Sequence, residues 1–290
     1  MAARQQPTHR LFQKLDRQLG KVASQPLPEN VHQFRTATRR VEAILEELAP
    51  EPDRNHRKLL KMLSRLRKRA GRLRDLDVQT AALRSLRVSE EPQRKAEVLR
   101  TLSDMRSKRE KKLLNALDLE TVREVRKRLK RADAELKIPE NGPDPLLLAS
   151  RIFATLARQQ GPLTEEVLHQ YRITGKRVRY IAELAGDSPE AQQMVSQLKR
   201  MQDSLGEWHD WLTLAATVKK QVGSGTNSAL LSAVNNIMRA KFRDALQTVT
   251  QTKAALQGKP VAPVRLAATT GAASGRKPVT SQGGAKAAIA

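Results

Sequence analysis

The sequence predicts an all-α protein built from two pseudo-repeated helical bundles around a central basic groove. Apolar residues recur at helical spacing along most of the 290 residues, and no window alternates β-branched with polar residues over the length of a strand. Prolines, glycines and capping residues divide the chain into helix-sized segments. Each bundle is expected to contain about four helices, and a disordered C-terminal tail should follow the second bundle.

Helix breakers and capping residues define the individual helices. Pro26 and Pro28 end the first helix, and Pro50 and Pro52 end the second. The residues expected to cap helix starts are Asn30, Asp53, Asp118 and Thr164. The expected helices span 8–22, 30–48, 53–88, 89–116, 118–137, 145–160, 165–184, 189–221 and 227–256.

The segment KIPENGPDP, residues 137–145, is the strongest internal break and is expected to separate the repeats. A single domain, residues 1–257, would then contain repeat one at about 5–138 and repeat two at about 144–257. Residues 258–290 are rich in Ala, Gly, Ser, Thr and Pro, with five basic residues and no acidic one. Such a segment buries too little apolar surface to offset its ordering entropy, so it is predicted to be disordered.

The charge of the chain indicates a polyanionic partner. There are 54 Lys and Arg residues against 30 Asp and Glu, a net charge of +24, and without the tail 49 basic and 30 acidic residues still leave +19. A compact chain with this charge repels itself unless an anion neutralises it. The absence of cysteine excludes disulfides and thiol nucleophiles and suits the cytoplasm. No apolar run is long enough for a membrane span, and the first residues lack the apolar core of a signal peptide.

Two pairs of similar segments recur in the same order. VHQFRTATRRV at 31–41 matches LHQYRITGKRV at 168–178, and GRLRDL at 71–76 matches GEWHDW at 206–211. The spacing within the two pairs is nearly equal, which predicts duplication of a multi-helix unit.

The first pair of segments places cations on one helix face. On an ideal helix His32, Arg35 and Arg39 lie on one side, whereas Phe34 and Val41 lie on the other. The second copy repeats the arrangement with His169, Arg172, Lys176 and Arg179. Both rows begin near a helix start, where free N–H groups also favour anions. These rows therefore predict an anion-binding site, although a solvated polar face is the alternative for either row alone.

A cationic stripe on the helix after Asp53 extends this pattern. Its members fall within an arc of about 100° on an ideal helix. They are Lys58, Lys61, Arg65, Lys68, Arg69 and Arg72. Like charges at this spacing repel one another, which favours an anion site over a solvated surface. The counterpart helix after Ser188 retains only Lys199 and Arg200 and adds Asp203 and Glu207, so unequal halves are expected.

The HxxRxxxRR and HxxRxxxKR blocks, each followed by an Arg-Asp or His-Asp element, resemble the CHAD family over about residues 5–255. The resemblance implies two pseudo-symmetric helical bundles around a basic groove, and binding of inorganic polyphosphate, with an expected association with polyphosphate granules. The ligand contacts that it implies are His32, Arg35, Arg39, Arg40, His169, Arg172, Lys176 and Arg177. Helical geometry adds Arg65, Arg69, Arg72 and Arg179 to this set. Supporting roles, in orienting or partly neutralising the cations, are expected for Asp75, His209 and Asp210.

No enzymatic activity is expected. The chain lacks phosphate-loop, nucleophile-elbow and zinc-protease motifs, and it lacks the ExExK signature of the CYTH domain often fused to the family. No cofactor is expected, and acidic and histidine side chains among so many cations favour orienting roles over a metal site. The alternatives are non-specific nucleic-acid binding, which the scarcity of aromatic residues disfavours for single strands, and a granule-coat scaffold.

Overall fold

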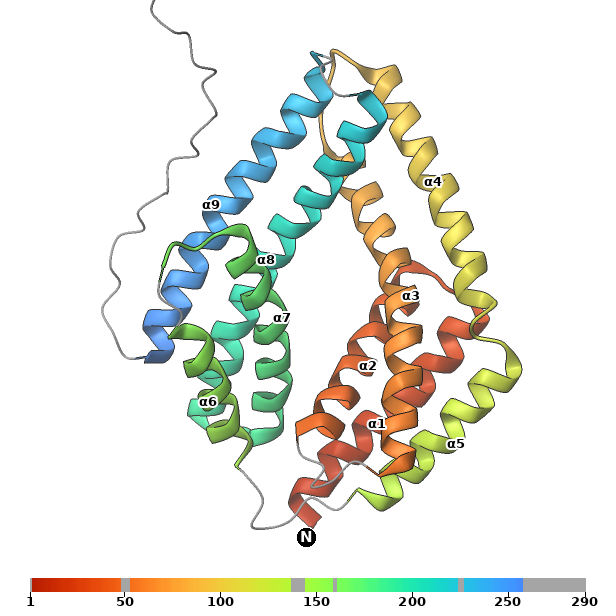
Figure 1. Ribbon diagram of the computed structural model, residues 1–290, viewed down its shortest axis with the longest axis vertical. Helices are drawn as coiled ribbons and strands as arrows, with labels where there is room; N and C mark the ends of the chain where they lie inside the picture. Colours follow the sequence, from red (N-terminus) through yellow and green to blue (C-terminus); the bar gives the residue numbers. More distant parts are fainter. Residues whose placement is uncertain (1, 48–52, 137–143, 159–160, 224–226, 258–290) are drawn as a thin grey trace, which may run out of the picture.

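The computed structural model describes residues 2–47, 53–136, 144–158, 161–223 and 227–257, and within these ranges it contains helices and no strands (Figure 1). The all-α prediction is confirmed. The α-helices are α1 (Ala2–Ser24), α2 (Pro28–Glu47), α3 (Arg54–Ser85), α4 (Pro92–Leu114), α5 (Leu119–Glu135), α6 (Pro145–Ala157), α7 (Glu165–Ala182), α8 (Pro189–Val222) and α9 (Ala229–Gln257). A short 3₁₀ turn, Glu183–Ala185, follows α7.

Side-chain caps fix most of the predicted helix starts. Asp53 accepts a hydrogen bond of 2.6 Å from the His56 amide, and Asp118 accepts one of the same length from the Thr121 amide. Thr164 caps α7 as predicted. The prediction for Asn30 was wrong. Because a proline is already suited to the first turn of a helix, α2 begins at Pro28, and the Asn30 side chain instead donates to the Gln25 carbonyl.

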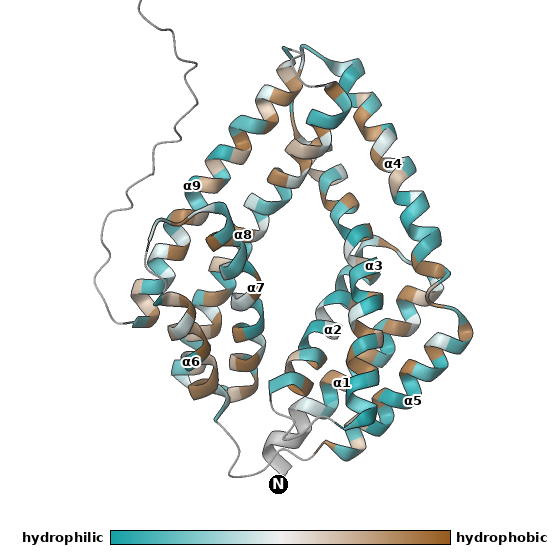
Figure 2. Ribbon diagram, in the orientation of Figure 1, coloured by the Kyte–Doolittle hydropathy of each residue, from teal (hydrophilic) through white to brown (hydrophobic). Residues whose placement is uncertain are grey.

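Two hydrophobic cores hold the two bundles together. The first joins α1, α2, α5 and the first part of α3 around residues such as Phe34 and Leu63. The second joins α6, α7, the first part of α8 and the last part of α9 around Tyr171 and Trp208. Figure 2 shows that hydrophobic residues recur along each helix between hydrophilic ones, as expected for helices that bury one face.

A third core connects the bundles at one end of the molecule. It contains Leu83 of α3 and Val98 of α4, together with Leu214 of α8 and Leu230 of α9. These residues lie toward the ends of α3 and α8, where Figure 1 shows the long helices of the two bundles converging. The third core therefore links the two halves beyond the place where α2 and α7 face each other.

The predicted boundary at 137–145 falls in part on residues 137–143, which lie outside the described residues, as does the predicted tail at 258–290. The boundaries of the two repeats and their origin by duplication remain predictions. None of the described helices is long and apolar enough to cross a membrane.

Candidate functional site

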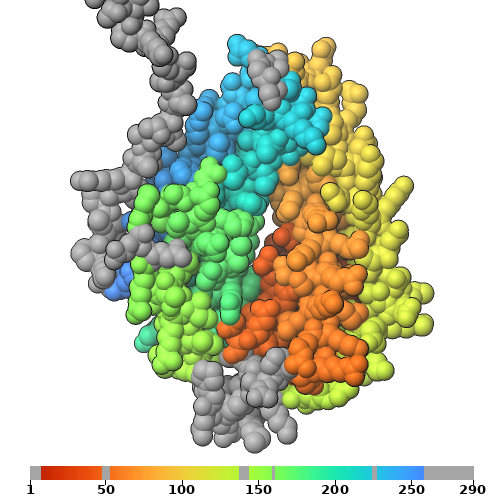
Figure 3. Space-filling model, viewed as in Figure 1, coloured from red at the N-terminus to blue at the C-terminus, as the bar shows by residue number. Residues whose placement is uncertain are grey.

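The two bundles meet along a seam where α2 contacts α7 and α3 contacts α8. Figure 3 shows this seam running along the molecule, with α7 on one side and α3 on the other. Charged side chains from all four helices influence one another across it. We refer to these side chains as the central cluster: His32, Arg35, Arg39, Arg67, Arg74, Asp75, His169, Arg172, Lys176, His209 and Asp210.

Arg35 and Arg172, which occupy equivalent positions in the two predicted repeats, both present unused donors to the seam. The Nε atom of each is buried and has no hydrogen-bond acceptor among the described residues. Nη1 of Arg35 lies 4.0 Å from Oδ1 of Asp75, which is too far for a hydrogen bond. Buried donors are almost always satisfied in folded proteins, so these two positions are suited to an anion that brings its own oxygen atoms.

The Arg35 side chain lies against α3 beside Gly71. A Cβ atom at Gly71 would lie 3.8 Å from Nε of Arg35, an ordinary van der Waals distance, so the guanidinium group packs close to the α3 backbone at this position. Burial lowers the pKa of Arg35, and the charges of Arg39, Arg172 and Arg74 lower it further, against the opposing effect of Asp75. The guanidinium stays charged because its ordinary pKa is far above neutrality.

Lys176 is the most strongly perturbed cation of the cluster. Burial, followed by the charges of Arg172, Arg39 and Arg35, lowers its pKa to about 7. Arg39 faces a similar environment, since burial and the nearby Arg67 lower its pKa. The cations across the seam therefore repel one another and are partly desolvated, which is unfavourable in free energy. An anionic ligand would offset this unfavourable free energy.

The histidines of the second half lie side by side. The ring centroids of His169 and His209 are 5.9 Å apart. Burial lowers the pKa of His209 to about 4, and the charges of Arg172, His169 and Lys176 act in the same direction. In the first half, burial and then the charge of Arg74 lower the pKa of His32. His209 is therefore neutral in the ligand-free site at neutral pH.

The carboxylates of the cluster do not balance its cations. Burial raises the pKa of Asp210 to about 6, although Arg172 and Lys176 oppose this shift. The Asp75 charge adds to the rise, which indicates that the two carboxylates lie near each other. A further carboxylate nearby, Glu42, already pairs with Arg67 at 2.6 Å. The cluster therefore keeps a surplus of positive charge.

Three of the predicted ligand residues pair with carboxylates instead. Arg40 of α2 donates to Glu183 at 2.9 Å, and Arg177 of α7 pairs with Glu47 of α2. We call these two ion pairs the Arg–Glu clasp. Arg179 lies 3.6 Å from Glu183 as well. The guanidinium groups of Arg40 and Arg179 both lie over the ring of Tyr180, with centroid distances of 5.6 and 5.1 Å. The clasp joins the bundles at the C-terminal ends of α2 and α7.

The structure brings together His32, Arg35, Arg39, Asp75, His169, Arg172, Lys176, His209 and Asp210 from the predicted set, but Arg65, Arg69 and Arg72 are exposed on another face of α3. Arg69 donates to the Lys112 carbonyl of α4. Sequence reasoning missed Arg67 and Arg74, which lie on the face of α3 toward α2. The repeat contained a signal for Arg74, because it aligns with His209.

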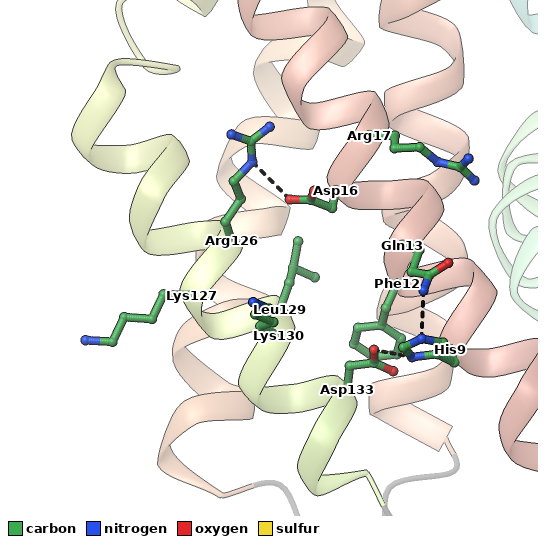
Figure 4. A pocket seen from close by; sticks show the side chains of 10 residues that line it. All are labelled: His9, Phe12, Gln13, Asp16, Arg17, Arg126, Lys127, Leu129, Lys130 and Asp133. Carbon is green, nitrogen blue, oxygen red and sulfur yellow. Dashed lines mark hydrogen bonds and ion pairs between the residues drawn. The ribbon is translucent and has the colours of Figure 1, made fainter.

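A separate pocket of about 570 Å³ lies between α1 and α5 (Figure 4). His9 faces Asp133, and Arg126 pairs with Asp16 at 3.0 Å. The further cations that line the pocket, Arg17, Lys127 and Lys130, are exposed to solvent, whereas the arginines of the central cluster are partly buried. Within the described ranges, no group of three or more acidic, histidine or cysteine side chains could hold a metal ion.

These observations define an all-α protein with a recessed cationic site between two helical bundles. The chain matches the family model of the CHAD domain over residues 8–219, and because this is well over half of its length, the protein belongs to the CHAD family. The match confirms the resemblance drawn from the two sequence blocks. A comparison with curated proteins found no match.

Two solved structures share the fold. One is the crystal structure of the CHAD domain from the plant Ricinus communis, with 18% sequence identity, a TM-score of 0.64, and coverage of 88% of this chain and 90% of that chain. The other is PptA from Streptomyces chartreusis, with 16% identity, a TM-score of 0.57, and coverage of 86% and 96%. At these identities the similarity concerns the fold alone.

Proposed function

We propose that the central cluster binds inorganic polyphosphate and that the protein acts by binding, without catalysing a reaction. The observation that carries this proposal is the pair of buried Nε donors on Arg35 and Arg172, which face the seam from opposite bundles without an acceptor. Membership of the CHAD family supports it, given the polyphosphate ligand that the resemblance implies.

The chemistry of the cluster fits a linear chain of phosphates. Each phosphate carries charge and oxygen acceptors, and a guanidinium can donate two bonds to one phosphate. Charge-assisted bonds of this kind contribute about 1.5–3 kcal/mol each, so several in series allow tight binding after desolvation. The cluster is recessed between four helices, and only 19% of the Arg35 side chain is exposed. A slender chain without bases suits such a site better than a duplex nucleic acid. An association with granules in the cytoplasm would be a consequence of polyphosphate binding.

The double variant Arg35→Ala/Arg172→Ala tests the proposal. We expect affinity for tripolyphosphate to fall by about a hundredfold or more, since two charge-assisted donors are lost. The melting temperature should hold or rise, because the variant removes two buried like charges. The matched control is Arg123→Ala/Arg151→Ala, in which both residues are exposed cations outside the cluster. Unchanged tripolyphosphate affinity in the first variant would refute the proposal.

Competition distinguishes polyphosphate from nucleic acid. Labelled polyphosphate should resist displacement by duplex DNA at equal phosphate concentration. Displacement by DNA at that concentration would favour the rival assignment, in which the surplus charge serves non-specific nucleic-acid binding.

A further inference from the structure

The cationic stripe of α3 lies outside the central cluster. It consists of Lys58, Lys61, Arg65, Lys68, Arg69 and Arg72. We propose that this stripe is a second, exposed binding surface, which holds the part of a long polyphosphate chain that extends out of the seam. The inference rests on the proposed function and adds to it a preference for long chains and a direction of exit. All six residues are exposed.

The stripe adjoins the central cluster on the surface of α3. Measured around an ideal helix from Gly71, the cluster residues Arg67, Arg74 and Asp75 fall within about 60° on either side. The stripe begins at Lys68, about 60° from Gly71, and extends to Arg69 at about 160°. Core residues such as Leu63 and Leu73 occupy the remaining arc. No apolar strip separates the stripe from the cluster, so a bound chain could pass from one to the other.

The stripe lacks carboxylate partners. Between Arg54 and Arg74 α3 contains no acidic residue. Within the described part of the chain, no stripe residue forms an ion pair, whereas the arginines of the neighbouring α4 and α5 commonly do, as Arg106 does with Asp77 and Arg128 with Glu124. Cations three and four positions apart on a helix destabilise it when unpaired. A polyanion along α3 would remove this repulsion.

The second half of the molecule shows the opposite arrangement. In the alignment of GRLRDL with GEWHDW, Arg72 corresponds to Glu207, and extending the alignment three residues toward the N-terminus matches Lys68 with Asp203. Asp203 pairs with Lys199 at 2.8 Å, and Glu207 pairs with Lys241 at 2.6 Å. The carboxylates on the corresponding face of α8 are therefore neutralised by Lys199 of α8 itself and by Lys241 of α9. A long chain is expected to leave the seam over α3 and not over α8.

The dimensions and composition of the stripe suit a chain of phosphates. From Lys58 to Arg72 the stripe covers fourteen residue steps, about 21 Å along the helix axis, so its six cations are spaced about 4.2 Å apart on average along the axis. The stripe contains no aromatic residue, and single-stranded nucleic acids are normally held by stacking on aromatic rings. A flexible chain with one charge on each small unit can follow such a row without stacking.

The test measures the affinity of two variants for polyphosphates of different length. The stripe variant is Lys61→Gln/Arg65→Gln/Lys68→Gln. The control variant, with the same charge change on the other half of the molecule, is Lys199→Gln/Arg200→Gln/Lys219→Gln. The ligands are tripolyphosphate, which the central cluster can hold alone, and a long-chain polyphosphate. We expect the stripe variant to keep its tripolyphosphate affinity within about twofold and to lose at least about tenfold for the long chain. For the long chain, the slope of log K against log salt should also become shallower by about 2, since three neutralised cations are lost. The control should change neither affinity by more than about twofold.

Three results would overturn the inference: equal losses for both ligands, an equal loss in the α8 control, or no loss for the long chain. Duplex DNA binding is measured with the same variants, and a loss of DNA binding together with no loss for the long chain would assign the stripe to nucleic acid. Failure of the proposed function is distinguishable, because it appears as tripolyphosphate binding that does not require Arg35 and Arg172.

Discussion

Lys176 of α7 and Asp210 of α8 both lie in the partly buried central cluster, and burial displaces the pKa of each toward neutrality, to about 7 for the ammonium group and to about 6 for the carboxyl group. An ordinary lysine and aspartate titrate far apart, near 10.5 and 3.8. Both groups in the ligand-free site therefore titrate close to physiological pH. A bound polyanion would favour the protonated form of both, so ligand binding is coupled to proton uptake.

Polyphosphate affinity should be higher at pH 6 than at pH 8. At pH 8 Lys176 is mostly neutral in the free protein and must gain a proton for the complex, which costs about tenfold in affinity. Asp210 adds to the effect, because it becomes fully ionised over the same interval. His209, with its pKa near 4, would also gain a proton if the ligand reaches it. Titration calorimetry at both pH values, in buffers of different ionisation enthalpy and matched salt, measures affinity and protons together.

The variant Lys176→Arg provides the control for this experiment. Arginine keeps the charge and does not titrate near neutrality, so proton uptake at pH 8 should fall while binding persists. Equal wild-type affinities at pH 6 and pH 8, without proton uptake, would remove Lys176 and the histidines from the ligand role.

Replacing Lys176 with methionine should stabilise the ligand-free protein and weaken polyphosphate binding. The pKa of Lys176 in the folded protein is about 7, below its ordinary value of 10.5, so the unfolded chain binds the proton more tightly. This penalty on folding is complete below pH 7 and fades as the pH rises toward 10.5. The gain from Lys176→Met should therefore be larger at pH 6 than at pH 9, with a magnitude of about 1–3 kcal/mol at the lower pH.

Thermal denaturation at pH 6 and pH 9 measures this gain, and the exposed Lys130→Met serves as the control. A lower melting temperature for Lys176→Met at pH 6 would mean that the ammonium group stabilises the empty site, contrary to the electrostatic argument.

Removing a clasp carboxylate should have opposite effects on stability and on affinity. Glu183 pairs with Arg40 and lies near Arg179, and its side chain is 25% exposed. In Glu183→Gln both guanidinium groups lose their counter-charge beside the cluster. We expect the free energy of unfolding to fall by about 1 kcal/mol, or about 2–4 °C in melting temperature, and polyphosphate affinity to rise severalfold. Glu90→Gln is the control, since Glu90 is exposed and lies outside any helix. If neither quantity changes relative to that control, the clasp does not join the halves in solution.

Asp75 should act by neutralising Arg35 and not by orienting it. Their closest atoms are 4.0 Å apart, which permits attraction between the charges but no hydrogen bond. Asp75→Asn keeps the shape of the side chain and removes one negative charge from the cluster. The affinity of this variant for tripolyphosphate, measured by filter binding, should be severalfold higher than that of the wild type. A severalfold decrease would instead show that the carboxylate positions the guanidinium.

The sequence was sufficient for the helices and for the rows on α2 and α7, because the apolar face of each helix defines its opposite face. It was insufficient for α3. Hydrophobic periodicity located the core arc around Leu63 and Leu73, but the cations occupy both flanks of that arc. Only the packing of α3 against α2 determines that the flank with Arg67 and Arg74 faces the seam, whereas Arg65 and Arg72 lie outside it.

The ion pairs of the Arg–Glu clasp could not be predicted from sequence patterns either. Arg40 and Arg177 occupy equivalent positions in the matching blocks, and the motif gave no reason to separate them from Arg35 and Arg172. Their partners lie 143 and 130 positions away in the sequence. Such pairs depend on how the two bundles approach each other, which no local periodicity describes.

The third core lies beyond one end of the central cluster, and the Arg–Glu clasp lies beyond the other. Because the two bundles are joined at both ends of the seam, a hinge motion that separates them is restricted. Binding of the ligand would then require side-chain adjustment alone. The association rate should be governed by electrostatic attraction and diffusion, with no slow hinge motion before binding.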